Sequence, residues 1–171
     1  MGCLKGHIMD KRLAQWVETI KGAFRDGPPN GWILGWPEKR HAEALARLTA
    51  PGEFFNKTSF DYWFCNTYEV YYPNSSVSNV KLTIQISFIV DAFEVYWDTY
   101  IKGAAVKPHG QVSIDDLKID ITQNVCSYLE SQGFVQVPDE WDGLKIPDVK
   151  LELSEPEDVT LNKCLFRDFD G

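Results

Sequence analysis

Carboxylates and aromatic rings alternate along two segments of this chain, a combination that suits a surface for another protein. The segment 61–73, "DYWFCNTYEVYYP", holds six aromatic residues and two carboxylates without a base, and the segment 92–100, "AFEVYWDTY", continues the alternation. Because successive side chains of a strand point to opposite faces, acids and rings of neighbouring strands would share one face. Exposed Tyr and Trp anchor protein interfaces, and carboxylates select a basic partner and speed its approach. The expected partner-binding residues of this face are Asp61, Trp63, Glu69, Tyr71, Glu94, Tyr96, Asp98 and Tyr100.

A second candidate surface is the loop "PDEWDGLKIPD", in which Asp139, Glu140 and Asp142 surround Trp141. A tryptophan among acids in a loop could anchor the chain in a basic groove of a partner. It could also fold back over the core as a lid. The first surface has a structural alternative as well, because rings favour strands even in a sheet that is covered on both sides.

The sequence contains no motif for catalysis, metal binding or cofactor binding. None of the three histidines has a Glu or His at metal-ligand spacing, and the four cysteines form no C-x-x-C pair. Phosphate-binding and nucleophile-elbow motifs are missing too. His109 could act as a general base or join a ligand site, but a solvated loop histidine is the commoner case. In "GWILGW", Trp32 and Trp36 are expected at the edge of the core. We therefore expect no catalytic residue, metal or cofactor.

Acidic residues accumulate toward the C-terminus. The 171 residues carry a formal net charge of −8, and the segments 1–50, 51–138 and 139–171 carry +3, −5 and −6. Such a chain repels phosphate backbones, so we expect no nucleic-acid partner, whereas a basic protein would be attracted. No stretch approaches the roughly 20 apolar residues that a membrane span needs, so no membrane partner is expected either.

Cysteine usage and the N-terminal segment favour a cytoplasmic protein. The thiols lie far apart and suit a reducing compartment; they are Cys3, Cys65, Cys126 and Cys164. The N-terminal segment lacks the apolar run of a secretory signal. Met-Gly-Cys resembles an acylation signal, but Gly6 stands where that signal has Ser or Thr. We expect a disordered leader over 1–8 and a single domain over 9–171.

Hydrophobic periodicity predicts an α+β domain. Helices are predicted over 10–24, 37–49 and 113–132. Long strands are predicted over 60–72, 80–90 and 92–100, and short strands over 134–138, 148–153 and 158–166. The three long strands are consecutive, so we expect them to form a central antiparallel three-strand meander. The helices would pack mainly on one face of this antiparallel sheet.

A small, acidic, aromatic-rich α+β domain with strands such as "VKLTIQISFIVDAFEVYW" and a late "VTLNKCLF" resembles bacterial immunity proteins of polymorphic or contact-dependent toxin systems. The resemblance implies a non-catalytic protein that binds its cognate toxin, often a basic nuclease, and blocks the toxin's active site or a needed motion.

Other functions stay open. The chain could be a small enzyme or ligand-binding domain with a pocket between the sheet and the helix at 114–132, on which His109 or Asp91 would have to converge. It could also be a structural adaptor subunit. An exposed aromatic face could close a homodimer.

Overall fold

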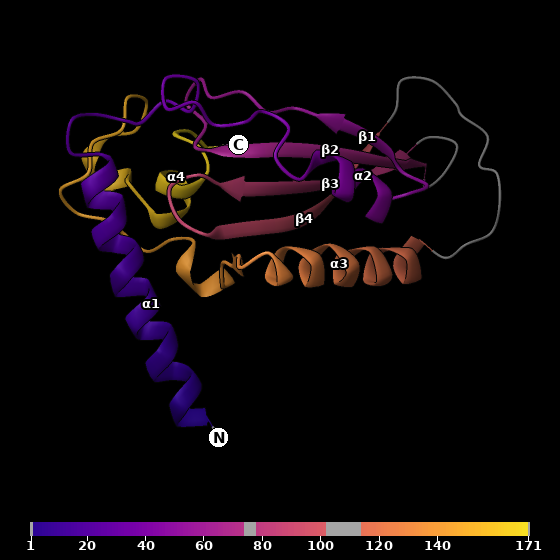
Figure 1. Cartoon of the computed structure of the whole chain (residues 1–171), viewed down its shortest axis with the longest axis horizontal. Coiled ribbons are helices and arrows are strands. Elements are labelled where there is room, and N and C mark those ends of the chain that lie inside the picture. The colour runs from indigo at the N-terminus through magenta and orange to yellow at the C-terminus, as the bar shows by residue number, and fades with distance from the viewer. Residues whose placement is uncertain (1, 74–77, 102–113, 171) are drawn as a thin grey trace.

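The computed structural model describes residues 2–73, 78–101 and 114–170, which form a single α+β arrangement (Figure 1). Its five-stranded sheet has the order β1 (Glu53–Asn56), β2 (Cys65–Pro73), β3 (Ser78–Ser87), β4 (Ala92–Ile101) and β5 (Val135–Gln136). Neighbouring strands are antiparallel except β4 and β5, which run parallel. The predicted α+β class is confirmed, and so is the meander, which β2, β3 and β4 form.

Within the described residues, four α-helices accompany the sheet: α1 (Gly2–Ala23), α2 (Ala42–Leu48), α3 (Ile114–Ser131) and α4 (Leu161–Leu165). Two short 3-10 helices follow α3, namely η1 (Asp139–Trp141) and η2 (Pro156–Asp158). α1 includes residues 2–8 of the expected leader. Among these helices, none combines the length and the apolar content that crossing a membrane would demand.

The first hydrophobic core lies between one face of the sheet and helices α2 and α3 (Figure 1). α3 contributes Ile121, Val125 and Leu129, whose helical spacing places them on one side of the helix. The helix ends at Ser131, and Gly133, the predicted terminator, follows with a φ of +91°. The strands contribute Tyr68, Val70, Tyr72, Val80, Leu82, Ile84, Ile86 and Phe93. The pocket that an enzyme would need at this interface is therefore filled with apolar side chains.

A second core lies at the end of the sheet where α1, the β3–β4 loop and the C-terminal segment meet. Trp16, Ile20 and Phe24 line the inner side of α1. The carbonyl of Leu165 accepts a hydrogen bond of 2.8 Å from Ser87 Oγ, on the sheet face opposite α3. α4 and the residues after it therefore cover this end of the second sheet face, while α2 and α3 cover the first.

Two predicted elements begin later in the structure because a residue adopts a positive φ. β2 starts at Cys65 rather than at Phe60, since Tyr62 has a φ of 62° and interrupts the extended chain. α2 starts at Ala42, well after Pro37, because His41 also has a φ of 62°.

The predicted C-terminal strands are mostly wrong. Residues 158–166 contain α4, whose N-terminus is capped where Thr160 Oγ1 accepts a hydrogen bond from Lys163 N at 3.3 Å. The segment 148–153 forms no strand, and the strand expected over 134–138 is reduced to the two residues of β5.

Truncating Leu129 to Ala is expected to lower the free energy of unfolding by about 2–5 kcal/mol, because the change leaves a cavity between α3 and the sheet. Ile119→Ala is the control, since Ile119 is 58% exposed on the same helix, and it should change stability by less than about 0.5 kcal/mol. Urea unfolding followed by circular dichroism measures both values. Equal losses in the two variants would contradict the packing of α3 on the sheet.

Candidate partner-binding surface

Part of the second sheet face is open, and it carries several of the predicted binding residues. The strand register places Glu69, Thr83 and Tyr96 in one row across the sheet. Tyr71, Lys81 and Asp98 form the next row. We name as the open sheet face the residues Phe55, Glu69, Tyr71, Lys81, Tyr96 and Asp98. The prediction that Glu69, Tyr71, Tyr96 and Asp98 share a face is confirmed, whereas Phe55 and Lys81 were not predicted as part of it.

The charges of the open sheet face largely compensate one another. Lys81 Nζ lies 3.1 Å from Glu69 Oε1 and 4.0 Å from Asp98 Oδ2. Tyr71 donates a hydrogen bond of 2.5 Å to Glu69 Oε2. Although burial alone would raise the pKa of Glu69, hydrogen bonds from Tyr71 and Lys81 hold it below its usual value. This face therefore offers little uncompensated negative charge to a basic partner.

Asp61 and Trp63 do not belong to that face, because both precede the start of β2. Asp61 is exposed. Trp63 is half-buried between C-terminal residues: its ring lies 5.1 Å from that of Phe169, and the guanidinium of Arg167 lies 5.7 Å from its centroid. The side chain of Tyr100 lies outside the described residues, and so does His109.

Glu94 points to the second sheet face, but the C-terminal segment covers it. Asn162 Nδ2, in α4, donates a hydrogen bond of 2.9 Å to Glu94 Oε2. Burial, together with the nearby carboxylate of Asp142, raises the pKa of Glu94 to about 7, while Asn162 and Arg167 oppose the shift. Glu94 is therefore largely covered in this structure, and its role in partner binding stays a prediction.

Trp141 is also buried. Of the two positions considered from the sequence, it takes the one in which the loop folds back over the core as a lid. Its side chain is 8% exposed, and its ring meets that of Trp16 edge to face with centroids 5.7 Å apart. The acids on either side of it remain accessible: Asp139 and Glu140 are exposed, and Asp142 is half-buried. Trp141 thus fixes the loop to α1 and leaves its carboxylates outside.

The greatest concentration of exposed carboxylates lies in residues 139–158, which we name the acidic loops. The exposed acids that form no ion pair with a described residue are Asp139, Glu140, Asp148, Glu152, Glu155 and Glu157. Asp158 differs, because it lies 3.8 Å from Lys145 Nζ. Four of the six acids were not among the predicted binding residues, although the local net charge of the C-terminal segment was the signal that could have identified them.

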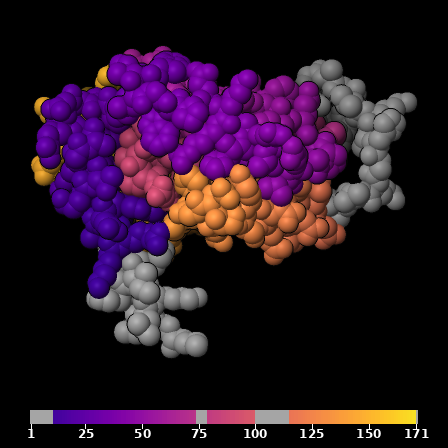
Figure 2. Space-filling model, in the orientation of Figure 1, coloured from indigo at the N-terminus to yellow at the C-terminus, as the bar shows by residue number. Residues whose placement is uncertain are grey.

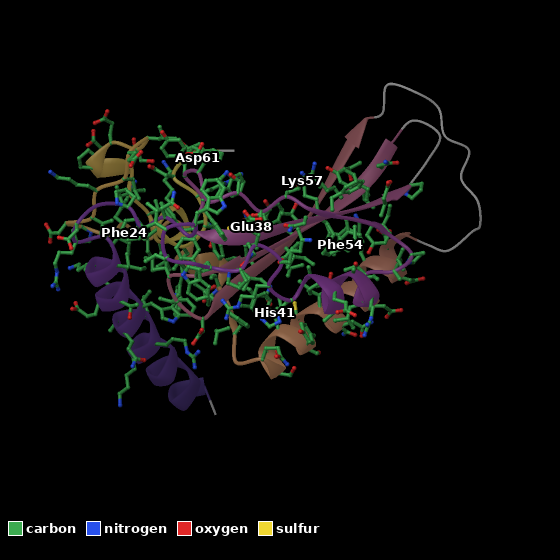
Figure 3. The ribbon with its side chains drawn as sticks, turned by 45° about the horizontal axis from the view of Figure 1, so that its top comes forward. Phe24, Glu38, His41, Phe54, Lys57 and Asp61 are labelled. Carbon is green, nitrogen blue, oxygen red and sulfur yellow. The ribbon has the colours of Figure 1, made fainter. Side chains whose placement is uncertain are left out.

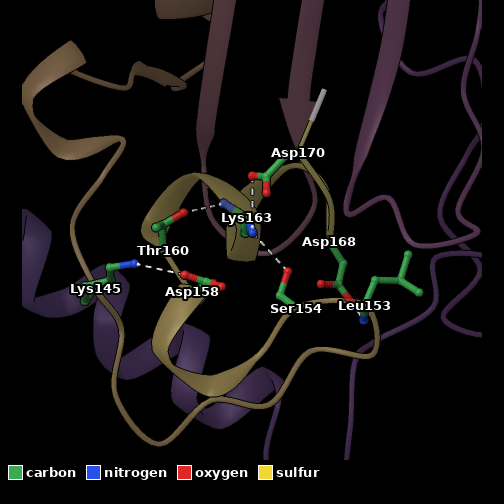
Figure 4. A network of polar contacts seen from close by, with 8 residues as sticks. All are labelled: Lys145, Leu153, Ser154, Asp158, Thr160, Lys163, Asp168 and Asp170. Carbon is green, nitrogen blue, oxygen red and sulfur yellow. Dashed lines mark hydrogen bonds and ion pairs between the residues drawn. The ribbon is translucent and has the colours of Figure 1, made fainter.

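A network of polar contacts holds the acidic loops in place (Figure 4). The buried carboxylate of Asp168 accepts hydrogen bonds from the backbone N–H groups of Glu152 (2.5 Å) and Leu153 (2.7 Å). Lys163 Nζ donates to Ser154 Oγ at 3.1 Å and lies 3.3 Å from Asp170 Oδ1. Hydrogen bonds to charged groups contribute about 1.5–3 kcal/mol each, so this segment is ordered before any partner arrives.

Two recesses open on the surface, one beside α1 and one beside α4. The first, of about 460 Å³, is lined by Trp16, Trp36, Arg40 and Phe88 among others. Phe88 belongs to the β3–β4 loop, which Figure 2 shows (pink) between α1 and the segment that follows α1. The other, of about 410 Å³, is lined by residues that include Asp142, Asn162 and Arg167. Among the described residues, no group of three or more His, Cys, Asp or Glu side chains is arranged to hold a metal ion.

No protein-family model, no curated protein and no solved structure matches this chain. The interpretation of the surface therefore rests on its geometry and charge.

The stability of the protein is expected to depend on the ionisation of Glu94. Its folded pKa of about 7 lies above the ordinary value of 4.5, so the folded state binds this proton more tightly than the unfolded state. The stabilisation is complete below pH 4.5 and is lost as the pH rises through 7. Between pH 5 and 8 this group alone should lower the free energy of unfolding by about 2 kcal/mol.

Replacing Glu94 with Gln removes this ionisation and keeps an oxygen for Asn162, so Glu94→Gln should be more stable than the wild type at pH 8 and lose this part of the pH dependence. Glu130→Gln, at an exposed position of α3, serves as the control. Urea unfolding at pH 5 and pH 8 measures the difference. Parallel pH profiles for the wild type and Glu94→Gln would contradict a buried Glu94.

Proposed function

We propose that this chain is a non-catalytic binding protein, and specifically a cytoplasmic immunity protein that neutralises a basic bacterial toxin domain. The observation that carries the proposal is the set of six exposed carboxylates in the acidic loops, which have no ion pair with any described residue. Carboxylates solvated only by water are available to the cations of a partner, and they attract that partner over a distance of about 10 Å in moderate salt.

The mechanism follows from the charge and from the order of these loops. A nuclease presents Lys and Arg to the phosphates of its substrate, and the carboxylates would pair with those cations and exclude the substrate. Because Asp168 and Lys163 already hold the loops, binding would not have to order them. The free thiols of Cys65, Cys126 and Cys164 suit a reducing cytoplasm.

One observation favours a second candidate function, a small ligand-binding protein or enzyme. Asp142 lines the recess of about 410 Å³, as does Asn162, which is hydrogen-bonded to Glu94. Both carboxyl groups have a raised pKa, in each case chiefly through burial. Carboxylates with shifted pKa values beside a cavity are a common feature of active sites. The amide of Asn162 and the contacts of α4 give this arrangement a structural explanation, so we rank it second.

The proposal predicts that a secreted toxin is encoded beside the gene of this chain, and the direct test uses that toxin. Association with the purified toxin domain should be tight and should slow as salt rises. The double variant Glu155→Lys with Glu157→Lys should lower the association rate roughly tenfold. Stopped-flow fluorescence at 50 and 500 mM salt measures both effects.

The matched control is Asp120→Lys with Glu130→Lys, which makes the same charge change at two exposed positions of α3. It should alter the association rate far less, because α3 lies apart from the acidic loops. Equal effects of the two double variants would mean that only the net charge matters. A wild-type chain that neither binds the toxin nor protects cells that produce it would overturn the proposal.

A further inference from the structure

The turn after α1 carries an exposed group of apolar side chains, which we name the apolar tip: Trp32, Ile33 and Leu34. Their exposed fractions are 50%, 86% and 59%, and Ile33 is the most exposed large apolar side chain among the described residues. Trp32 was expected at the edge of the core, but half of its surface is exposed. Trp36 does pack at the edge of the core, where its ring stacks on that of Phe88. Three consecutive apolar residues in contact with water are unfavourable unless they serve a contact.

Hydrogen bonds fix the apolar tip in this exposed position. Asn30 Oδ1 accepts from the backbone N–H groups of Trp32 (3.0 Å) and Ile33 (3.2 Å). Trp36 N donates to the carbonyl of Gly31 at 2.9 Å and closes the turn. The indole of Trp32 donates to Glu38 Oε1 at 2.7 Å. The tip is therefore ordered in the free protein, so a partner would not have to order it on binding.

Gly31 sets the base of the tip against the core. A Cβ atom at this position would lie 2.5 Å from the ring of Phe60, so only glycine allows this approach. The ring of Trp32 meets the same Phe60 ring edge to face with centroids 5.8 Å apart. With its indole held on this ring, the turn directs Ile33 and Leu34 away from the core.

The base of the apolar tip lies beside Glu152 of the acidic loops. A small cavity of about 100 Å³ at its base is lined by residues that include Asn30, Phe60, Asp61 and Glu152. Figure 3 shows Asp61 beside the C-terminal segment, and the backbone N–H of Asp168 donates a hydrogen bond of 3.0 Å to the carbonyl of the neighbouring Tyr62. Asp61, Tyr62, which is 38% exposed, and Glu152 of the acidic loops thus lie together at the base of the tip.

The charges around the tip indicate what it contacts. Asp61 and Glu152 would be repelled by anionic lipid headgroups, as would a chain of net charge −8. A second copy would bring the same carboxylates face to face, which is also unfavourable. A protein pocket that is apolar inside and lined by Lys and Arg at its rim fits both the tip and its acidic border.

We propose that the apolar tip inserts Ile33 and Leu34 into an apolar pocket, with a basic rim, on the same basic protein that the acidic loops bind. This inference rests on the proposed function, and it assigns the two surfaces different roles. The carboxylates speed the approach of the partner, whereas the tip slows its departure, because desolvated apolar contacts act mainly on the dissociation rate.

The test compares Ile33→Ser with Ile119→Ser, in the full chain bound to the purified toxin domain. Ile119 is the matched control, since it is 58% exposed on α3 and far along the chain from the tip. Ile33→Ser should raise the dissociation rate roughly tenfold or more and leave the association rate nearly unchanged. Ile119→Ser should change neither rate. Surface plasmon resonance gives both rates, and thermal unfolding confirms that both variants are folded.

Each other outcome counts against the inference in a different way. If the wild type does not bind the toxin, the proposed function falls and the inference falls with it. If the wild type binds and Ile33→Ser dissociates no faster than Ile119→Ser, the tip has no role and the proposed function stands. A wild-type dimer in sedimentation that Ile33→Ser abolishes would assign the tip to a second copy. Flotation of the wild type, but not of Ile33→Ser, with phosphatidylserine vesicles would assign it to a bilayer.

Discussion

The contact between the C-terminal segment and the ends of β2 and β3 determines which surfaces of this molecule a partner can reach. Phe64 N donates to the carbonyl of Phe166 at 2.8 Å, and Ser87 Oγ donates to that of Leu165 at the same distance, so the last residues are joined to the middle of the chain. This contact covers Glu94 with α4 and brings Asp168 under the backbone of residues 152 and 153. It therefore closes one end of the sheet face and, by the same bonds, supports the acidic loops.

The open sheet face and the acidic loops both carry carboxylates, but they differ in whether those carboxylates are already paired within the protein. On the open sheet face, Lys81 and Tyr71 satisfy Glu69, so a cation from a partner would have to compete with bonds already made. In the acidic loops, six exposed carboxylates have no ion pair with any described residue, and their mutual repulsion destabilises the free protein slightly. A basic partner would relieve that repulsion. Bringing like charges together on an ordered base is thus unfavourable for folding and favourable for binding.

The elements that could be predicted from the sequence are those whose packing imposes a long regular pattern. β3, β4 and α3 each repeat their periodicity over ten or more residues, because one side of each is buried along its length. α4 has five residues, too few to show a period, and its cap at Thr160 was hidden within an apparent alternation. The ion pair of Glu69 with Lys81 depends on the strand register that brings the two side chains together. Trp141 is buried against the ring of Trp16, which lies 125 positions earlier in the chain. Such distant pairings are set by tertiary structure rather than by local composition.

Amide hydrogen exchange of the chain, alone and in complex with the toxin domain that the proposed function predicts, tests most directly whether the acidic loops are the surface that binds. The account predicts slower exchange in the complex over residues 139–158, with the strongly hydrogen-bonded centres of β2 and β3 unchanged. Slower exchange confined to β1, β2 and β4, with the acidic loops exchanging as in the free chain, would contradict it and return the binding site to the open sheet face.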